Sequence, residues 1–194
     1  MDRDRIAHLL AYLLNPSILA CMTLSLLALK QGERGMGQVG LWILLTGLFV
    51  LVWPFFYFSG LVRRGRIGGL YVPDRTQRCG PFVGMIGLYV TGFLVLKLVH
   101  APHTMVAALV IYIINLIVMT AVTLLWKISF HAMGAAISVV ILMGGYGLSA
   151  WPALGLIPLV GWARVRTGAH TIRQVIAGAL LGGGMAGLLW RAFS

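Results

Sequence analysis

A cluster of polar residues near the C-terminal end stands out in an otherwise apolar chain. Segment 164–174 contains Arg164, Arg166, His170, Arg173 and Gln174, and an apolar stretch follows it directly. This order places His170 where a polar loop enters a helix, and the unpaired N–H groups of a helix start favour anions. Gln174 lies one helical turn beyond His170, on the same helical face. The pattern indicates a site for an anionic group such as phosphate.

A second polar group precedes another apolar stretch. Lys127 and Ser129 lie just ahead of His131, which begins that stretch. A single histidine at a helix start is most often a polar cap, and an arginine loop with an incidental histidine is the equivalent reading of segment 164–174. Because each group combines cationic side chains with a histidine ahead of an apolar stretch, we interpret the two groups as two halves of one phosphate-handling site.

Arginines also gather in the longest polar stretch, residues 63–80. Arg63, Arg64 and Arg66 fit anchoring at the cytoplasmic side of a membrane, where Lys and Arg are enriched. Arg75 and Arg78 are three residues apart, beside Pro81, and are better candidates for phosphate ligation.

The composition requires a membrane. The chain has 194 residues, of which 60% are hydrophobic and 10% charged, and its mean hydropathy is +0.95. A soluble domain of this size cannot bury so much apolar surface. The apolar runs are long and continuous, which favours helices over barrel strands. We expect a multi-pass integral membrane protein of a bacterial or archaeal cell membrane.

The charge balance excludes several function classes. The chain contains fifteen Lys and Arg but only four Asp and Glu, which gives a net charge of +11. Nucleic-acid binding is disfavoured because no soluble domain presents the basic face. Metal chemistry that relies on carboxylate ligands has almost no ligands available, so we expect neither a metal nor a cofactor. Membrane lipids are the expected surroundings, and the sequence sets no oligomeric state.

The apolar segments predict an all-α, polytopic helical bundle with six to seven transmembrane segments in a single domain covering residues 1–194. N-terminal helices occupy residues 6–62, with a kink at Asn15-Pro16, and the core occupies about residues 63–191. Glycines 178, 182, 183 and 187 have the spacing of close helix packing. The expected helices are Ile6–Leu29, Val39–Val62, Pro81–Val99, Thr104–Leu125, His131–Gly147, Trp151–Ala163 and Thr171–Trp190. Counting crossings through these helices puts all three polar groups on one face of the membrane.

Three short signatures resemble those of the type 2 phosphatidic acid phosphatase superfamily, in the same order. Arg164-x5-His170-x3-Gln174 resembles the third signature, Ser-Arg-x5-His-x3-Asp. Ser129-Phe130-His131 resembles the second, Pro-Ser-Gly-His, and Arg75 with Arg78 resembles a degenerate first, Lys-x6-Arg-Pro. The resemblance covers about residues 75–187 and implies a phosphatidic acid phosphatase-like core.

The chain departs from these signatures at several positions. Ala163 stands where the family has Ser, and Ile128 and Phe130 replace Pro and Gly. Gln174 replaces the Asp that orients the catalytic histidine. A glutamine oxygen can accept a hydrogen bond from an imidazole and fix its tautomer, but it carries no charge to stabilise an imidazolium.

The resemblance implies metal-free hydrolysis of a lipid phosphate or an isoprenoid (polyprenyl) pyrophosphate. His170 would form a phosphohistidine, oriented by Gln174, and His131 would act as acid and then as base. The phosphate ligands implied are Arg75, Arg78, Lys127, Ser129, Arg164 and Arg166. Two other readings stay open: a non-catalytic protein that binds or transports lipid phosphates on the same scaffold, and a small structural membrane protein.

Overall fold

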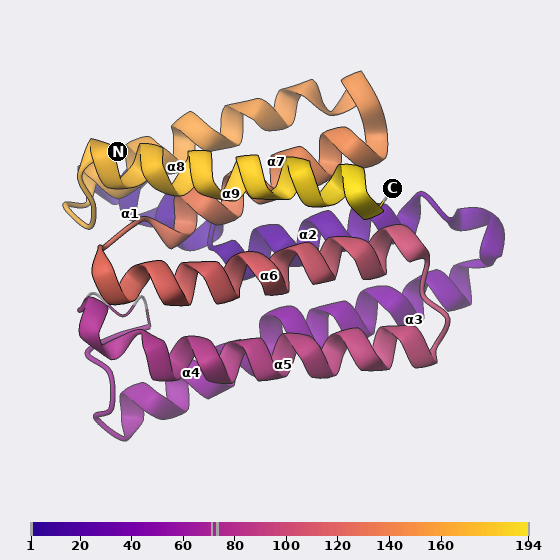
Figure 1. Ribbon diagram of the computed structural model, residues 1–194, viewed down its shortest axis with the longest axis horizontal. Helices are drawn as coiled ribbons and strands as arrows, with labels where there is room; N and C mark the ends of the chain where they lie inside the picture. The colour runs from indigo at the N-terminus through magenta and orange to yellow at the C-terminus, as the bar shows by residue number, and fades with distance from the viewer. Residues whose placement is uncertain (1, 71, 73, 194) are drawn as a thin grey trace. The chain divides into compact units, whose positions relative to one another are not determined.

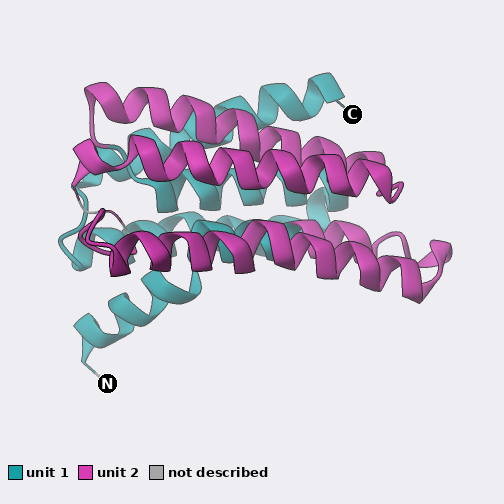
Figure 2. Cartoon of the chain, turned by 90° about the horizontal axis from the view of Figure 1, so that it is seen from below, with its two compact units in different colours: residues 1–23, 128–194 teal, residues 24–127 magenta. Residues whose placement is uncertain are grey.

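The computed structural model describes residues 2–70, 72 and 74–193, and every regular element among them is a helix (Figure 1). The chain divides into two compact units. Unit 1 comprises Met1–Thr23 with Ile128–Ser194, and unit 2 comprises Leu24–Lys127 (Figure 2).

Five helical stretches among the described residues are long and apolar enough to cross a membrane. A bent helix pair at the N-terminus would be a sixth. These helices mark the chain as a multi-pass membrane protein, as the composition predicted. The five stretches are Met36–Arg63, Cys79–Leu98, His103–Leu125, Phe130–Arg166 and Ile172–Phe193.

The predicted kink at Asn15-Pro16 is confirmed. Helix α1 (Arg3–Leu13) and helix α2 (Pro16–Leu29) meet at an angle of 52°. The Asn15 side chain accepts a hydrogen bond from the Ser17 N–H at 2.9 Å, and Pro16 occupies a helix start, where its missing N–H costs nothing. The break therefore follows from the local sequence.

Unit 2 contains three long helical stretches. The first consists of α3 (Met36–Thr46), the π-helical turn η2 (Gly47–Val52) and α4 (Trp53–Arg63), after the short helix η1 (Gly32–Arg34). Pro54 explains the π-helical turn, because a proline removes one backbone donor and a wider turn accommodates the loss. Helices α5 (Cys79–Leu98) and α6 (His103–Leu125) pack against each other. Close contacts at Gly84 with Tyr57 and at Gly92 with Phe49 hold α5 against the first stretch.

Unit 1 contains a helical hairpin and the C-terminal helix. Helix α7 (Phe130–Tyr146) is followed by the 3-10 helix η4 (Gly147–Gly155), where the chain turns back, and α8 (Leu156–Arg166) returns along α7 (Figure 1). The predicted helix Trp151–Ala163 is wrong in its start, since α8 begins five residues later at Leu156. Pro152 lies inside η4, and a proline interrupts α-helical hydrogen bonding, so the break between the two predicted helices extends through Gly155.

Helices α7 and α9 (Ile172–Phe193) run parallel and form the most extensive helix contact of unit 1. A Cβ atom on Gly178 would lie 2.5 Å from the Ser129 carbonyl oxygen, and one on Gly182 would lie 2.7 Å from Met133. Both approaches are possible only for glycine, so the packing role predicted for Gly178 and Gly182 is confirmed. A Cβ on Gly187 would meet nothing within 4 Å.

Candidate functional site

Three helix ends meet at one end of unit 1, where α7 and α9 begin and α8 finishes (Figure 1). The Ser129 N–H donates to the Gln174 carbonyl at 3.1 Å and ties the start of α7 to the first turn of α9. His131 lies two residues after Ser129, and His170 lies four residues before Gln174. The two histidines therefore lie at the same end of the α7–α9 pair.

A tight connection between α8 and α9 fixes the spacing of Arg164 and His170. The Thr167 hydroxyl donates to the carbonyls of Ala163 and Arg164, at 2.9 and 3.3 Å. Gly168 then turns the chain with a φ of +67°, a conformation that favours glycine. The His170 N–H reaches back to the Arg164 carbonyl at 3.2 Å. The five-residue spacing of the third signature is therefore the length of this turn.

The His170 ring is oriented by Gln174. Its Nδ1 lies 3.1 Å from Gln174 Oε1, and the Thr171 N–H donates to the same oxygen at 3.2 Å. Because a backbone N–H only donates, the amide group facing it must be the oxygen. In the neutral ring Nδ1 therefore carries the proton and Nε2 keeps the lone pair, which is the form of a nucleophile that attacks through Nε2.

His131 lies in the first turn of α7, close behind its N-cap. Ser129 Oγ accepts a hydrogen bond from the Ala132 N–H at 3.3 Å, so this hydroxyl caps the helix. Both side chains are buried, with Ser129 fully enclosed and His131 5% exposed. His170 is similarly buried at 7%. Two imidazoles thus lie in the interior of unit 1 near two helix N-termini, where backbone N–H groups favour negative charge.

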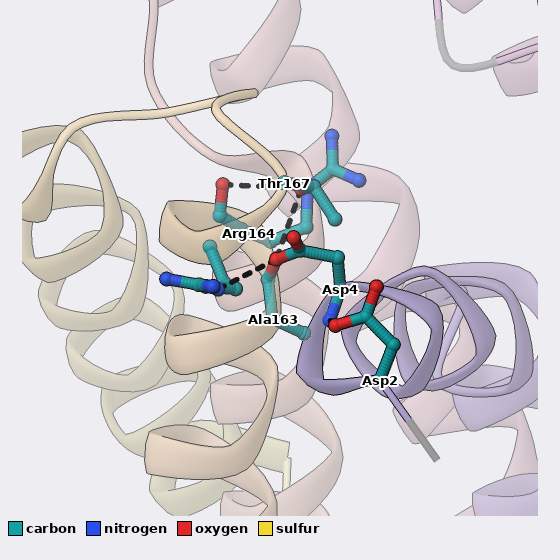
Figure 3. Close-up of polar contacts among 6 residues, drawn as sticks. Asp2, Asp4, Ala163, Arg164 and Thr167 are labelled. Atoms are coloured by element: carbon teal, nitrogen blue, oxygen red, sulfur yellow. Dashed lines mark hydrogen bonds and ion pairs between the residues drawn. The ribbon is translucent and has the colours of Figure 1, made fainter.

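The two arginines of α8 have different environments. Arg164 is buried, whereas Arg166 is exposed and its Nε lies 2.7 Å from Asp4 Oδ1. Figure 3 shows Asp4 of α1 beside the last turn of α8, where Thr167 folds back on Ala163 and Arg164. The pair of Asp4 with Arg166 is exposed, so it contributes little to stability. Asp4 occupies one side of the Arg166 guanidinium, which the sequence analysis predicts to bind phosphate.

The other predicted phosphate ligands, Arg75, Arg78 and Lys127, belong to unit 2. Arg75 is exposed and its Nη1 donates to the Leu124 carbonyl at 2.8 Å, which satisfies a carbonyl in the last turn of α6. Arg78 is buried and its Nε donates to the Val72 carbonyl at 2.9 Å. Lys127 is half-buried at the end of the unit. A guanidinium has five N–H donors, and each of these bonds uses one of them.

No family model, no curated protein and no solved structure matches this chain. The resemblance to the phosphatase superfamily therefore rests on the three short signatures alone.

Asp74 organises the loop that carries Arg75 and Arg78. It precedes the short 3-10 helix η3 (Arg75–Gln77), and its Oδ1 accepts from the Thr76 N–H at 3.0 Å. The pKa of Asp74 lies below its ordinary 3.8, first because of that backbone N–H, then because of the Thr76 hydroxyl and the charges of both arginines, while desolvation opposes them. Because its pKa is lowered in the folded state, the Asp74 carboxylate stabilises the fold at pH values above its ordinary pKa. This contribution is lost as the pH falls through the pKa of the folded state. The loop is therefore fully capped at neutral pH.

Two residues of the site, Thr171 and Asp4, were not assigned a role by the sequence analysis. Thr171 forms a reciprocal capping box with Gln174, since the Gln174 N–H also faces Thr171 Oγ1 at 3.4 Å. The Thr-x-x-Gln pattern ahead of an apolar run was a readable signal for it. Asp4, the partner of Arg166, is 162 positions away in sequence and gave no such signal.

Metal ligands are not gathered anywhere in the described part of the chain. Among those residues, no three His, Cys, Asp or Glu side chains lie close enough together to hold a metal ion.

Proposed function

We propose that this protein is a metal-independent membrane phosphatase that hydrolyses a lipid phosphate or polyprenyl pyrophosphate through a phosphohistidine. The observation that carries the proposal is the contact of His170 Nδ1 with Gln174 Oε1 at 3.1 Å, which leaves Nε2 as the nucleophilic atom. The imidazole of His131 at the same end of unit 1, and the buried Arg164, supply the other groups that phosphoryl transfer needs.

The reaction would proceed in two steps. The Nε2 lone pair of His170 forms a bond to phosphorus while the bond from phosphorus to the lipid oxygen breaks, and His131 donates a proton to that oxygen. His131 then takes a proton from water, the water oxygen bonds to phosphorus, and the phosphorus–nitrogen bond breaks. Inorganic phosphate leaves and both histidines return to their starting states.

Cationic groups would hold the phosphate oxygens in both steps. Arg164 fits this role best, because a buried guanidinium offers its donors in a fixed fork. Arg166 would have to exchange Asp4 for phosphate. The resemblance of the signatures implies the same role for Ser129 of unit 1, and for Arg75, Arg78 and Lys127 of unit 2.

The proposed scaffold is a phosphatidic acid phosphatase-like core with six to seven crossings. It counts α7 and α8 as separate crossings, because α8 returns along α7. The acyl or prenyl chain of the substrate would then lie between helices in the lipid while its phosphate reaches the helix ends of unit 1.

Gln174 favours a second candidate function, non-catalytic binding or transport of lipid phosphates. Its side chain takes part in a capping box, so a structural reason for glutamine exists without catalysis. A neutral amide also leaves the imidazolium of His170 without a compensating charge.

Replacing Gln174 by Asp separates the two functions. A carboxylate would add the missing charge, while the correct tautomer is already present, so we expect only part of the effect that an Asp-to-Asn change has in a catalytic triad. Phosphate release from lipid phosphates in the presence of EDTA should rise by about tenfold in Gln174→Asp. The assay uses purified full-length protein in lipid and a panel of lipid phosphates and prenyl pyrophosphates.

A rise in Gln174→Asp supports a weakened enzyme. No release by either protein, with retained binding of a lipid phosphate, supports the binding protein. If charge reversal at Arg75 and Arg164 changed only expression or topology, a structural role would explain the chain better than either.

A further inference from the structure

The first turn of α9 contains a hydrogen-bonded pair that reaches the candidate nucleophile. The Thr171 N–H donates to Gln174 Oε1 at 3.2 Å, and the Gln174 N–H faces Thr171 Oγ1 at 3.4 Å. Gln174 Oε1 also lies 3.1 Å from His170 Nδ1. One oxygen is thus shared between a helix cap and the histidine ring.

We infer that Thr171 is a positioning residue that sets the tautomer of His170 through Gln174. As a statement about catalysis the inference rests on the proposed phosphatase function. The tautomer itself is a property of the ring and can be measured without any substrate.

The oxygen and the NH2 group of the Gln174 amide have opposite effects on the His170 ring. If the Gln174 amide were reversed, its NH2 group would donate to Nδ1. The neutral ring would then carry its proton on Nε2, and a protonated Nε2 has no lone pair with which to attack phosphorus. The Thr171 N–H opposes this reversal, because two donors would face each other and one hydrogen bond would be lost. The Thr171 hydroxyl holds the first turn of α9 in the geometry that brings this N–H to the oxygen.

The experiment measures the ring directly. Full-length protein with 15N-labelled histidine is reconstituted in lipid, and the His170 nitrogen signals are assigned by their loss in His170→Asn. At a pH where the ring is neutral, wild type and Thr171→Ser should show the proton on Nδ1. Thr171→Val removes the hydroxyl at nearly constant shape and should populate both tautomers, with kcat on lipid phosphate lower by on the order of tenfold and KM unchanged.

A rescue separates positioning from simple helix capping. Glutamate has two acceptor oxygens and no reversed form, so Thr171→Val combined with Gln174→Glu should restore the proton to Nδ1. Thr91→Val, which removes an exposed hydroxyl bonded within α5, is the matched control and should leave His170 unchanged. Thr171→Ala provides a second truncation if the valine variant does not fold.

An unchanged Nδ1–H tautomer in both truncations would overturn the inference, whatever happens to activity. A changed tautomer in Thr171→Val that Gln174→Glu restores would support it. If wild type releases no phosphate while the tautomer still responds to Thr171, the proposed function fails and the control of the ring by Thr171 stands.

Discussion

Replacing His170 by Asn should abolish phosphate release from lipid phosphates, with a loss of more than about 10³-fold in kcat. The NH2 group of asparagine occupies the position of Nδ1 and can still donate to Gln174 Oε1, so the turn from Arg164 to Thr171 should keep its form. It has no ring nitrogen to bond phosphorus, and water alone then has to attack the phosphate. The measurement is phosphate release by full-length protein in lipid, with EDTA present, alongside a melting curve.

His8 offers the matched control for this replacement. It is an exposed histidine of unit 1, on α1, with no assigned role. His8→Asn should retain full activity, and both variants should melt at the wild-type temperature. Activity that survives in a correctly folded His170→Asn protein would rule out the phosphohistidine.

Adding a methyl group at Gly178 should destabilise the protein by about 1–3 kcal/mol, because it overpacks a helix contact. The new Cβ would lie 2.5 Å from the Ser129 carbonyl oxygen, which is a backbone atom and cannot rotate away. Helix α7 would have to separate from α9, and the bond from the Ser129 N–H to the Gln174 carbonyl would lengthen or break. Because this bond joins the two halves of the site, activity should fall with stability.

The same substitution six residues further along α9 isolates the packing effect. A Cβ on Gly184 would meet nothing within 4 Å, so Gly184→Ala only replaces a poor helix former with a good one. We expect its melting temperature to be equal to or slightly above that of the wild type. Equal melting temperatures for Gly178→Ala and Gly184→Ala would show that the α7–α9 contact has room for a methyl group, contrary to the 2.5 Å approach.

The helix positions were predictable because they depend on local sequence features, namely the hydropathy of each segment and the positions of prolines. The kink at Asn15-Pro16 and the close packing at Gly178 and Gly182 follow from residue type and spacing alone. The start of α8 was not predictable in the same way. The segment around Pro152 is as apolar as a helix, and only its 3-10 hydrogen bonding separates it from one.

The contacts of the candidate site also fall into two kinds, those that local sequence predicts and those that depend on helix packing. His170 and Gln174 are four residues apart, so the sequence predicted that they lie close together, but His170 precedes α9, which begins at Ile172, and their contact at 3.1 Å depends on how the helix is capped. The bond between Ser129 and Gln174 joins two helices and depends on the glycine that lets them approach. The pair of Asp4 with Arg166 depends on how α1 packs against α8, which no local pattern encodes.

We expect His170 to carry a phosphoryl group during the reaction and His131 to transfer the protons. A His131→Ala variant given a phosphate ester with a good leaving group tests it most directly. Such a leaving group needs no acid, so the first step should proceed, whereas the second step lacks its base and should slow by about 10²- to 10⁴-fold.

The reaction is quenched rapidly at alkaline pH, and peptide mass spectrometry then identifies the residue that carries the phosphoryl group. We expect a phosphoryl group on His170 that accumulates in His131→Ala and is absent when His170→Asn is added. A phosphoryl group on any other residue, or none on His170 while phosphate is still released, would contradict it.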